Sequence, residues 1–116
     1  MTAFRAYLAA LWLVLFVYTA VVIGNHGASL FPVFFGDILR MAWPGQFNLD
    51  FLFMLTLSAL WVAWRHRFTP GGLVLAVLAF FGGASFLSVY LLIVSFQVKG
   101  DVRALVVGVG PKSAQA

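Results

Sequence analysis

Two long apolar stretches joined by a basic turn dominate the pattern of hydrophobic and polar positions. The stretch 49–64 contains no ionisable residue after Asp50, and the stretch 73–96 contains none. A helix that is apolar on all sides must be buried in protein or in lipid. Because a chain of 116 residues has too little other mass to bury two such helices, the pattern predicts membrane spans at about 48–66 and 72–98.

An apolar run near the amino terminus predicts another span. Residues 6–24 are interrupted only by two tyrosines and a threonine. At about 1.5 Å per residue the run approaches the ~30 Å thickness of the hydrocarbon core. It also exceeds the apolar core of about 7–15 residues that is typical of a cleaved signal peptide. We therefore expect an uncleaved first span that ends at Gly24 or Gly27.

The apolar run at about 30–43 is too short for a span and predicts an interfacial or re-entrant helix. Ser29 is its candidate N-cap, and the Trp-Pro-Gly-Gln segment at 43–46 is expected to end it. Asp37 and Arg40 lie three positions apart, so they share a helix face and can pair.

The polar residues around the second span suggest how that span begins and ends. Asn48 is its candidate N-cap, and Asp50 in the first turn suits the positive end of the helix dipole. Arg65 and Arg67 are expected to face the headgroups beyond its far end. The tail 99–116 contains no run long enough to cross a membrane, and its last six residues, Pro111 to Ala116, are predicted to be disordered.

Composition agrees with the membrane class. Hydrophobic residues make up 64% of the chain and charged residues 9%, against about 45–50% and about 25% in soluble domains. The sequence therefore predicts a single all-α membrane domain over residues 1–116. It comprises three transmembrane helices plus one short interfacial or re-entrant helix, as a multi-pass protein of the cell membrane.

The formal net charge of +4 does not indicate nucleic-acid binding, because the basic residues are scattered and form no stripe. With three spans, one side of the membrane would carry Arg5, Arg65 and Arg67. The other side would carry Arg40, Lys99, Arg103 and Lys112. Basic residues close to span ends weigh most in setting orientation, which predicts a cytoplasmic amino terminus and a carboxyl terminus on the opposite side.

Few residues offer chemistry. Asp50 is a candidate because intramembrane carboxylates are commonly functional, although a capping role is the favoured alternative. Asp37 with Arg40 could line a polar opening, but a structural ion pair is favoured. His26 and His66 are predicted to lie on opposite sides, where they cannot converge on a metal. With no cysteine and no glutamate in the chain and no nucleotide-binding motif, we expect no enzyme, no metal site and no cofactor.

Small residues cluster in the middle of the third predicted span. Residues of this kind at four-residue spacing let helix backbones approach closely in lipid, and paired glycines permit a bend. The candidate packing residues are Ala79, Gly82, Gly83, Ala84 and Ser88.

Three segments together resemble a group of small bacterial and plant membrane proteins known only as a domain of unknown function. They are Asn48-Leu49-Asp50-Phe51, Trp61-Val62-Ala63-Trp64-Arg65 and Gly82-Gly83-Ala84-Ser85 with Tyr90. The resemblance covers roughly residues 48–107 and implies a fold but no activity. His66 departs from the acidic residue of that pattern.

The leading hypothesis is a non-enzymatic accessory or assembly subunit, surrounded by membrane lipid. It would form a homo-oligomer or join a larger membrane complex through the small residues of the third span. A second hypothesis is an oligomeric pore, holin-like protein or small-solute carrier, with Asp50 or Asp37 facing a wet interior. A third is a lipid- or pigment-binding protein.

Overall fold

The structure is a computed structural model that describes residues 1–108. Its helices in chain order are α1 (Thr2–His26), α2 (Leu30–Leu39), α3 (Trp43–Arg65), α4 (Pro70–Gln97) and α5 (Val102–Val107). Helices α1, α3 and α4 are long and apolar enough to cross a membrane, and α2 is a shorter apolar helix. The predicted all-α fold class, with three helices of spanning length and apolarity and one shorter apolar helix, is confirmed. The segment predicted to be disordered, Pro111 to Ala116, lies outside the described residues.

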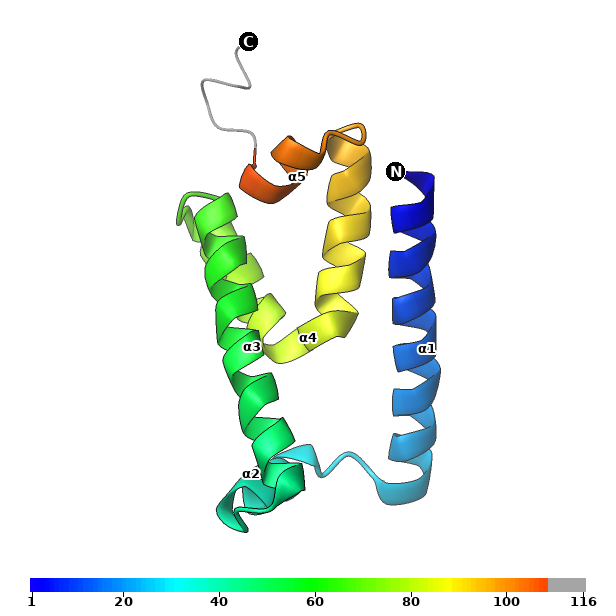
Figure 1. Cartoon of the computed structure of the whole chain (residues 1–116), viewed down its shortest axis with the longest axis vertical. Coiled ribbons are helices and arrows are strands. Elements are labelled where there is room, and N and C mark those ends of the chain that lie inside the picture. The colour runs from blue at the N-terminus through cyan, green and yellow to red at the C-terminus, as the bar shows by residue number, and fades with distance from the viewer. Residues whose placement is uncertain (109–116) are drawn as a thin grey trace.

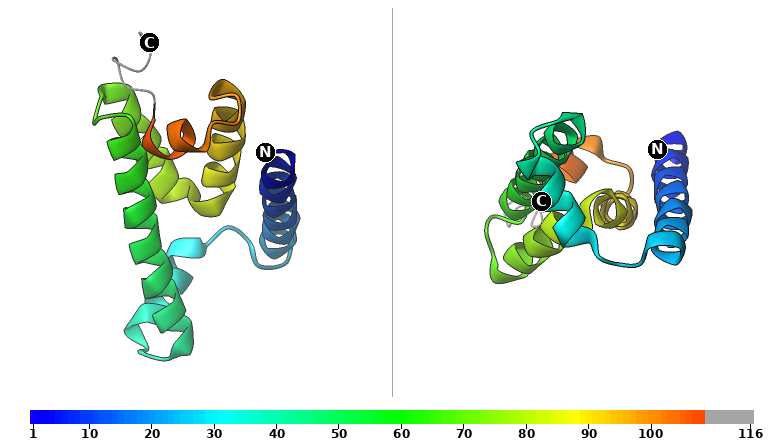
Figure 2. Two further views of the ribbon diagram at one scale, coloured as in Figure 1. Left: turned by 45° about the horizontal axis from the view of Figure 1, so that its top comes forward. Right: turned by 90° about the horizontal axis from the view of Figure 1, so that it is seen from below.

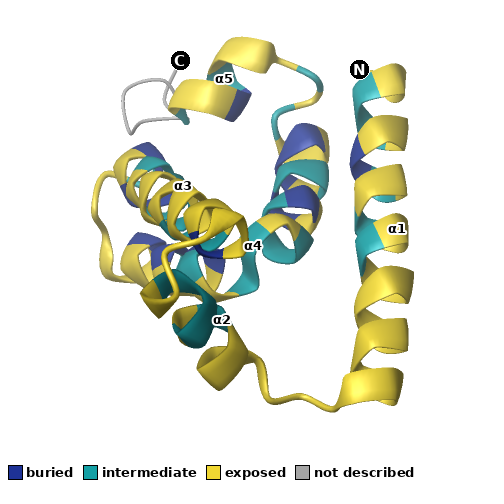
Figure 3. Ribbon diagram, turned by 60° about the horizontal axis from the view of Figure 1, so that its bottom comes forward, coloured by how far each residue is buried: buried dark blue, intermediate teal, exposed yellow. Residues whose placement is uncertain are grey.

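Helix α1 is continuous and ends where the sequence places one of two candidate glycines. Gly27 has a φ of 79°, a left-handed value that glycine adopts without a steric penalty from Cβ. Its N–H donates to the carbonyl of Ile23, so an otherwise free carbonyl of the last turn is paired. Every residue from Phe16 to His26 is exposed, and Figure 3 shows this half of α1 without any buried position.

Helix α2 ends, and helix α3 begins, earlier in the chain than predicted. The segment 43–46, expected to end the short helix, instead forms the first turn of α3, because proline is well tolerated at the start of a helix. Asn48 therefore lies inside α3 and is not its N-cap; its side chain donates to the carbonyl of Phe34 at 3.1 Å. A Cβ on Gly45 would overlap the carbonyl oxygen of Asp37, so α2 packs directly on the first turns of α3.

Helix α4 does not run straight. At Gly83 the backbone leaves the helical region, with φ 56° and ψ −139°, and the ribbon turns back on itself (Figure 1). This divides α4 into a first arm, residues 70–82, and a second arm, residues 84–97. At about 1.5 Å per residue each arm is roughly 20 Å long, too short for the ~30 Å hydrocarbon core. We call the two arms the hairpin and residues 82–85 its tip.

His66 shows that both arms return to one end of the molecule. A Cβ on Gly72, near the start of the first arm, would overlap the His66 side chain. The Tyr90 hydroxyl, on the second arm, lies 2.6 Å from His66 Nε2. A straight helix would hold Gly72 and Tyr90 about 27 Å apart, so one histidine would not reach both.

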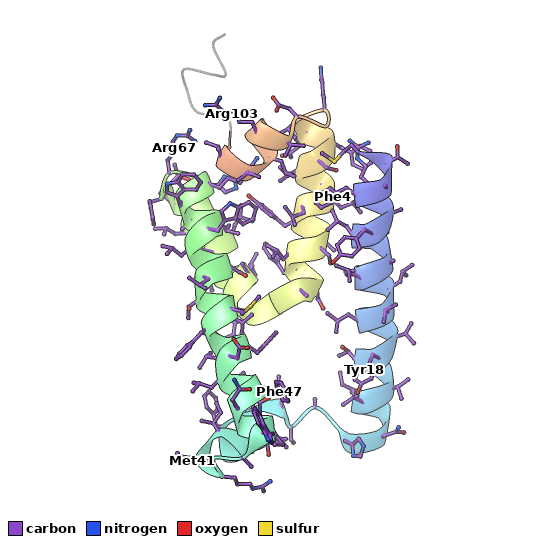
Figure 4. The ribbon with its side chains drawn as sticks, in the orientation of Figure 1. Phe4, Tyr18, Met41, Phe47, Arg67 and Arg103 are labelled. Carbon is purple, nitrogen blue, oxygen red and sulfur yellow. The ribbon has the colours of Figure 1, made fainter. Side chains whose placement is uncertain are left out.

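The reversal places the charges differently from the prediction. Arg67 and Arg103 lie at the same end of the molecule as Phe4, and Tyr18, Met41 and Phe47 lie at the other end (Figure 4). Gly100 lies close to Met1. The expectation that Lys99 and Arg103 lie across the membrane from Arg65 and Arg67 is therefore wrong; the end of the chain, residues 109–116, lies outside the described residues. A run of apolar residues with a central glycine pair does not reveal whether it crosses or returns. We call this end the basic end; its described basic residues are Arg5, Arg65, Arg67, Lys99 and Arg103.

The hairpin is the central element of the packing. It contacts both α1 and α3, and Figure 2 shows its second arm between these two helices. The buried core lies mainly between α3, the two arms and α5, and consists of Val62, Ala63, Ala76, Ala79, Tyr90, Val94 and Leu105. Because the hairpin extends only part of the way along α1, the other half of α1 lacks a neighbour among residues 1–108.

The predicted tail contains a short helix, α5, at the basic end. The Asp101 side chain accepts hydrogen bonds from the N–H groups of Arg103 and Ala104, which are among the free donors of a helix start. Leu105 is 5% exposed, so α5 is anchored on the core by one apolar side chain.

Candidate functional site

The hairpin tip lies against the middle of α3. A Cβ on Gly83 would be 3.3 Å from Phe51 Cζ and 3.4 Å from Leu55 Cδ2. Beside this contact is a cavity of ≈ 290 Å³, which we call the tip cavity. Its polar side chains are Asp50 and Ser58; the other lining residues are Phe47, Phe51, Met54, Leu55, Gly83, Ala84 and Leu87.

The tip cavity is a candidate site because it combines a carboxylate with irregular backbone. A break in a helix leaves N–H and C=O groups that regular helical pairing no longer satisfies. At membrane depth such groups are tolerated only where protein buries them or where they line a water-filled space. Gly83 and Ala84, at the break in α4, line the tip cavity. The backbone there must therefore be covered by protein or must face water.

Asp50 is not in the first turn of α3, contrary to the prediction. That turn contains no acidic residue, since α3 begins seven positions before Asp50. Its carboxylate is exposed and lies at the tip cavity, so the helix-dipole argument for a capping role no longer applies. Its position at a cavity beside irregular backbone favours a functional role.

A second polar cluster forms at the basic end around Arg65. The prediction that Arg65 faces the headgroups is wrong: it is 7% exposed. Its Nε donates to the carbonyl of Leu105 at 2.7 Å, and another guanidinium nitrogen donates to that of Ala104 at 3.1 Å. Trp61 Nε1 donates to the carbonyl of Val106 at 3.0 Å. These donors pair the terminal carbonyls of α5 and place positive charge at the negative end of its dipole.

Arg65 also contacts Tyr90, which in turn contacts His66. The Arg65 guanidinium donates to the Tyr90 hydroxyl at 3.2 Å. The hydroxyl also lies 2.6 Å from His66 Nε2, and which of these two atoms donates depends on the tautomer of His66. Burial, and next the Arg65 charge, lower the pKa of His66, because both disfavour the imidazolium form.

Arg5 joins α1 to the second arm. Its Nε donates to the Ser95 hydroxyl and its Nη2 to the Ser95 carbonyl, both at 3.0 Å. The guanidinium carbon also lies 3.8 Å from the ring centroid of Phe96, a favourable cation–π distance. The basic end is therefore held together by arginines that bond to neutral acceptors.

The remaining polar candidates lie away from the tip cavity. Arg40 and Asp37 form the predicted pair at 3.2 Å, and Arg40 is largely exposed. His26 lies in the last turn of α1, at the end opposite His66. Within residues 1–108, no three His, Cys, Asp or Glu side chains converge as a metal site would require.

The five small residues of α4 have different environments. Ala79 and Ser88 are buried inside the protomer, with 1% and 4% exposure. Gly82 and Gly83 are half-buried, whereas Ala84 is exposed. The outer two of these five residues, Ala79 and Ser88, therefore pack within the chain. Of the five, Ala84 at the tip presents an exposed surface.

Reasoning from the sequence missed the Arg65–Tyr90–His66 cluster. Tyr90 is 24 positions from His66 and 25 from Arg65, and only the reversal at Gly83 brings them together. The paired glycines were the available signal, but they permit a bend without specifying its angle.

No known protein family, curated protein or solved structure matches this chain. The resemblance of residues 48–107 to a group of small bacterial and plant membrane proteins therefore stays a prediction. The three long apolar helices are compatible with an integral, multi-pass membrane protein.

Proposed function

We propose that this protein is a non-enzymatic assembly subunit of the cell membrane, whose hairpin tip is covered by a second copy or by another membrane protein. The observation that carries the proposal is the reversal at Gly83 between arms too short to cross. Irregular backbone needs a protein or aqueous neighbour at membrane depth, and Ala84 at the tip is exposed in the protomer.

The surroundings of the tip support coverage by protein. Beyond the hairpin, α1 from Tyr18 to His26 is exposed throughout, so a partner helix would find an unoccupied surface beside the tip. Gly82, Gly83 and Ala84 would let its backbone approach closely, as small residues do at helix contacts in lipid. The tip region is also overwhelmingly apolar, which suits a protein neighbour better than a wide aqueous path.

The charge distribution supports an orientation with the basic end in the cytoplasm. Apart from Arg40, the basic residues among residues 1–108 all belong to the basic end. Basic residues near span ends favour the cytoplasmic side. In this orientation the amino terminus and α5 are both cytoplasmic.

The test is photo-crosslinking from the tip in intact membranes. A photoreactive amino acid at Ala84 is expected to yield a discrete product, at twice the protein's mass for a second copy or at another defined mass for a different subunit. The same group at Val74, which is 62% exposed on the first arm, serves as the control. Equal, diffuse labelling from both positions would contradict coverage of the tip.

The tip cavity favours one alternative, a pore or small-solute carrier. In such proteins, broken helices and carboxylates meet at a water-filled site, and Asp50 lines the same cavity as Gly83. Because the chain contains no cysteine, Ala84→Cys provides a unique thiol. Modification by a membrane-impermeant reagent, together with loss of vesicle flux on Asp50→Asn, would support this alternative and contradict the assembly proposal.

A further inference from the structure

A groove opens between the two arms of the hairpin at the basic end. It has a volume of ≈ 270 Å³. Leu75 of the first arm and Phe86, Val89 and Ile93 of the second arm supply much of its apolar lining. Its polar lining residues include His66, in the turn between α3 and α4, and Gln97, at the end of the second arm. The groove is therefore amphipathic along its length.

The dimensions of the groove match one leaflet of a bilayer. Its lining on the second arm runs from Gln97 to Phe86, eleven residues or about 16 Å of helix. Half of the ~30 Å hydrocarbon core is about 15 Å. An acyl chain entering from the basic end would therefore contact apolar side chains over its whole depth in that leaflet.

The polar end of the groove offers hydrogen-bond donors. The His66 ring carries at least one N–H, and the Gln97 amide carries two further N–H groups. Positive side chains adjoin both residues in the chain, Arg67 after His66 and Lys99 two positions after Gln97.

The charge of this end is not balanced within residues 1–108. The basic end contains five basic side chains and one carboxylate, that of Asp101, which accepts from backbone N–H groups of α5. In the described part of the chain the sole ion pair is Asp37–Arg40, in α2 and the turn that follows it. An anionic group would therefore meet uncompensated positive charge where the donors lie.

We propose that this groove binds one acyl chain of an anionic phospholipid, with the lipid phosphate at the His66–Gln97 end. The apolar lining accommodates the chain, and the flanking basic residues select the headgroup. Attraction of anionic lipid by a nearby lysine or arginine corresponds to about fivefold in affinity per residue. This site goes beyond the proposed function, since its headgroup end lies at the basic end and it does not depend on what covers the tip.

The test is native mass spectrometry of the full chain released from nanodiscs of phosphatidylglycerol or of phosphatidylcholine. We expect one retained phosphatidylglycerol and little retained phosphatidylcholine. Ile93→Trp, which fills the groove, should lower retention of phosphatidylglycerol by about tenfold or more. The matched control is Val77→Trp, because Val77 is 55% exposed against 53% for Ile93 but does not line the groove; it should retain the lipid. Lys99→Gln should reduce the preference for phosphatidylglycerol by about fivefold.

Equal retention of the two lipids, or equal retention by the Ile93 and Val77 variants, would overturn the proposal. If Ile93→Trp does not fold, Ile93→Cys replaces it, since the chain has no other cysteine. A bulky maleimide attached to this cysteine after purification should displace the phosphatidylglycerol. Retention of the lipid after complete modification would equally overturn the proposal.

Discussion

Replacement of Gly83 by alanine tests the reversal of α4 at one backbone position. The φ of 56° and ψ of −139° at Gly83 are accessible to glycine but strained for a residue with a Cβ, at a cost of about 1–3 kcal/mol. The new Cβ would also press on Phe51 and Leu55, at 3.3 and 3.4 Å. Gly83→Ala therefore destabilises the hairpin.

The same substitution favours the straight alternative. Within a continuous helix, alanine is more favourable than glycine by about 1 kcal/mol. Together the two effects shift the balance between hairpin and straight helix by about 2–4 kcal/mol, or from about 30-fold to nearly 1,000-fold in population. A hairpin that is only a few kcal/mol more stable than its alternative would be visibly depopulated.

The assay is a spin-label distance measurement in lipid between cysteines introduced at Val74 and Gln97. A straight helix separates these positions by about 35 Å. The hairpin holds them much closer, because Leu75 and Gln97 line one groove. We expect the short distance in the parent chain, and a longer population or a lower resistance to denaturing detergent in Gly83→Ala.

The matched control is Gly71→Ala, since a Cβ on Gly71 would meet no atom within 4 Å and the φ of Gly71 is not positive. It should leave both the distance and the detergent resistance unchanged. Identical behaviour of the Gly83 and Gly71 variants would refute the reasoning. A long distance in the parent chain would refute the hairpin itself.

Three further predictions concern the basic end. Arg65→Ala should destabilise the protein by about 2–4 kcal/mol, because it leaves buried carbonyls of α5 unpaired; detergent unfolding should show it, whereas the exposed Arg67→Ala should change stability by less than about 0.5 kcal/mol. Gly72→Ala should destabilise and Gly71→Ala should not, because only the former Cβ overlaps the His66 side chain; similar melting temperatures would contradict this packing. The pKa of His66 is lowered in the folded state, so as the pH falls through about 6.5 the unfolded chain takes up a proton first and stability falls; His66→Gln should lose this dependence, and an unchanged pH profile would contradict it.

The fold class could be predicted from the sequence because the hydropathy of a helix indicates whether lipid or water surrounds it. The uncharged stretches in α1, α3 and α4 require lipid or a large protein core, and the described residues bury only a small share of these helices. Features that depend on residues close together in the chain could also be predicted. Gly27 ends α1, and Asp37 pairs with Arg40 one helical turn away.

The candidate site was less predictable because it depends on a backbone angle. Gly82 and Gly83 indicate that α4 can bend, but the φ and ψ of Gly83 decide between a kinked span and a hairpin. That decision moves Lys99 and Arg103 to the side of Arg65, and it brings Tyr90 to His66. Asn48 was misplaced for another reason: a proline followed by glycine is typical both of a helix end and of the first turn of a helix.

The reversal of α4 is tested most directly by the sidedness of single cysteines in sealed, oriented membrane vesicles. Arg67→Cys lies before α4, Arg103→Cys lies after it, and Met41→Cys lies at the opposite end of the molecule (Figure 4). We expect a membrane-impermeant maleimide to label Arg67→Cys and Arg103→Cys from one side and Met41→Cys from the other. Labelling of Arg103→Cys from the same side as Met41→Cys would show that α4 crosses the membrane and would contradict the hairpin.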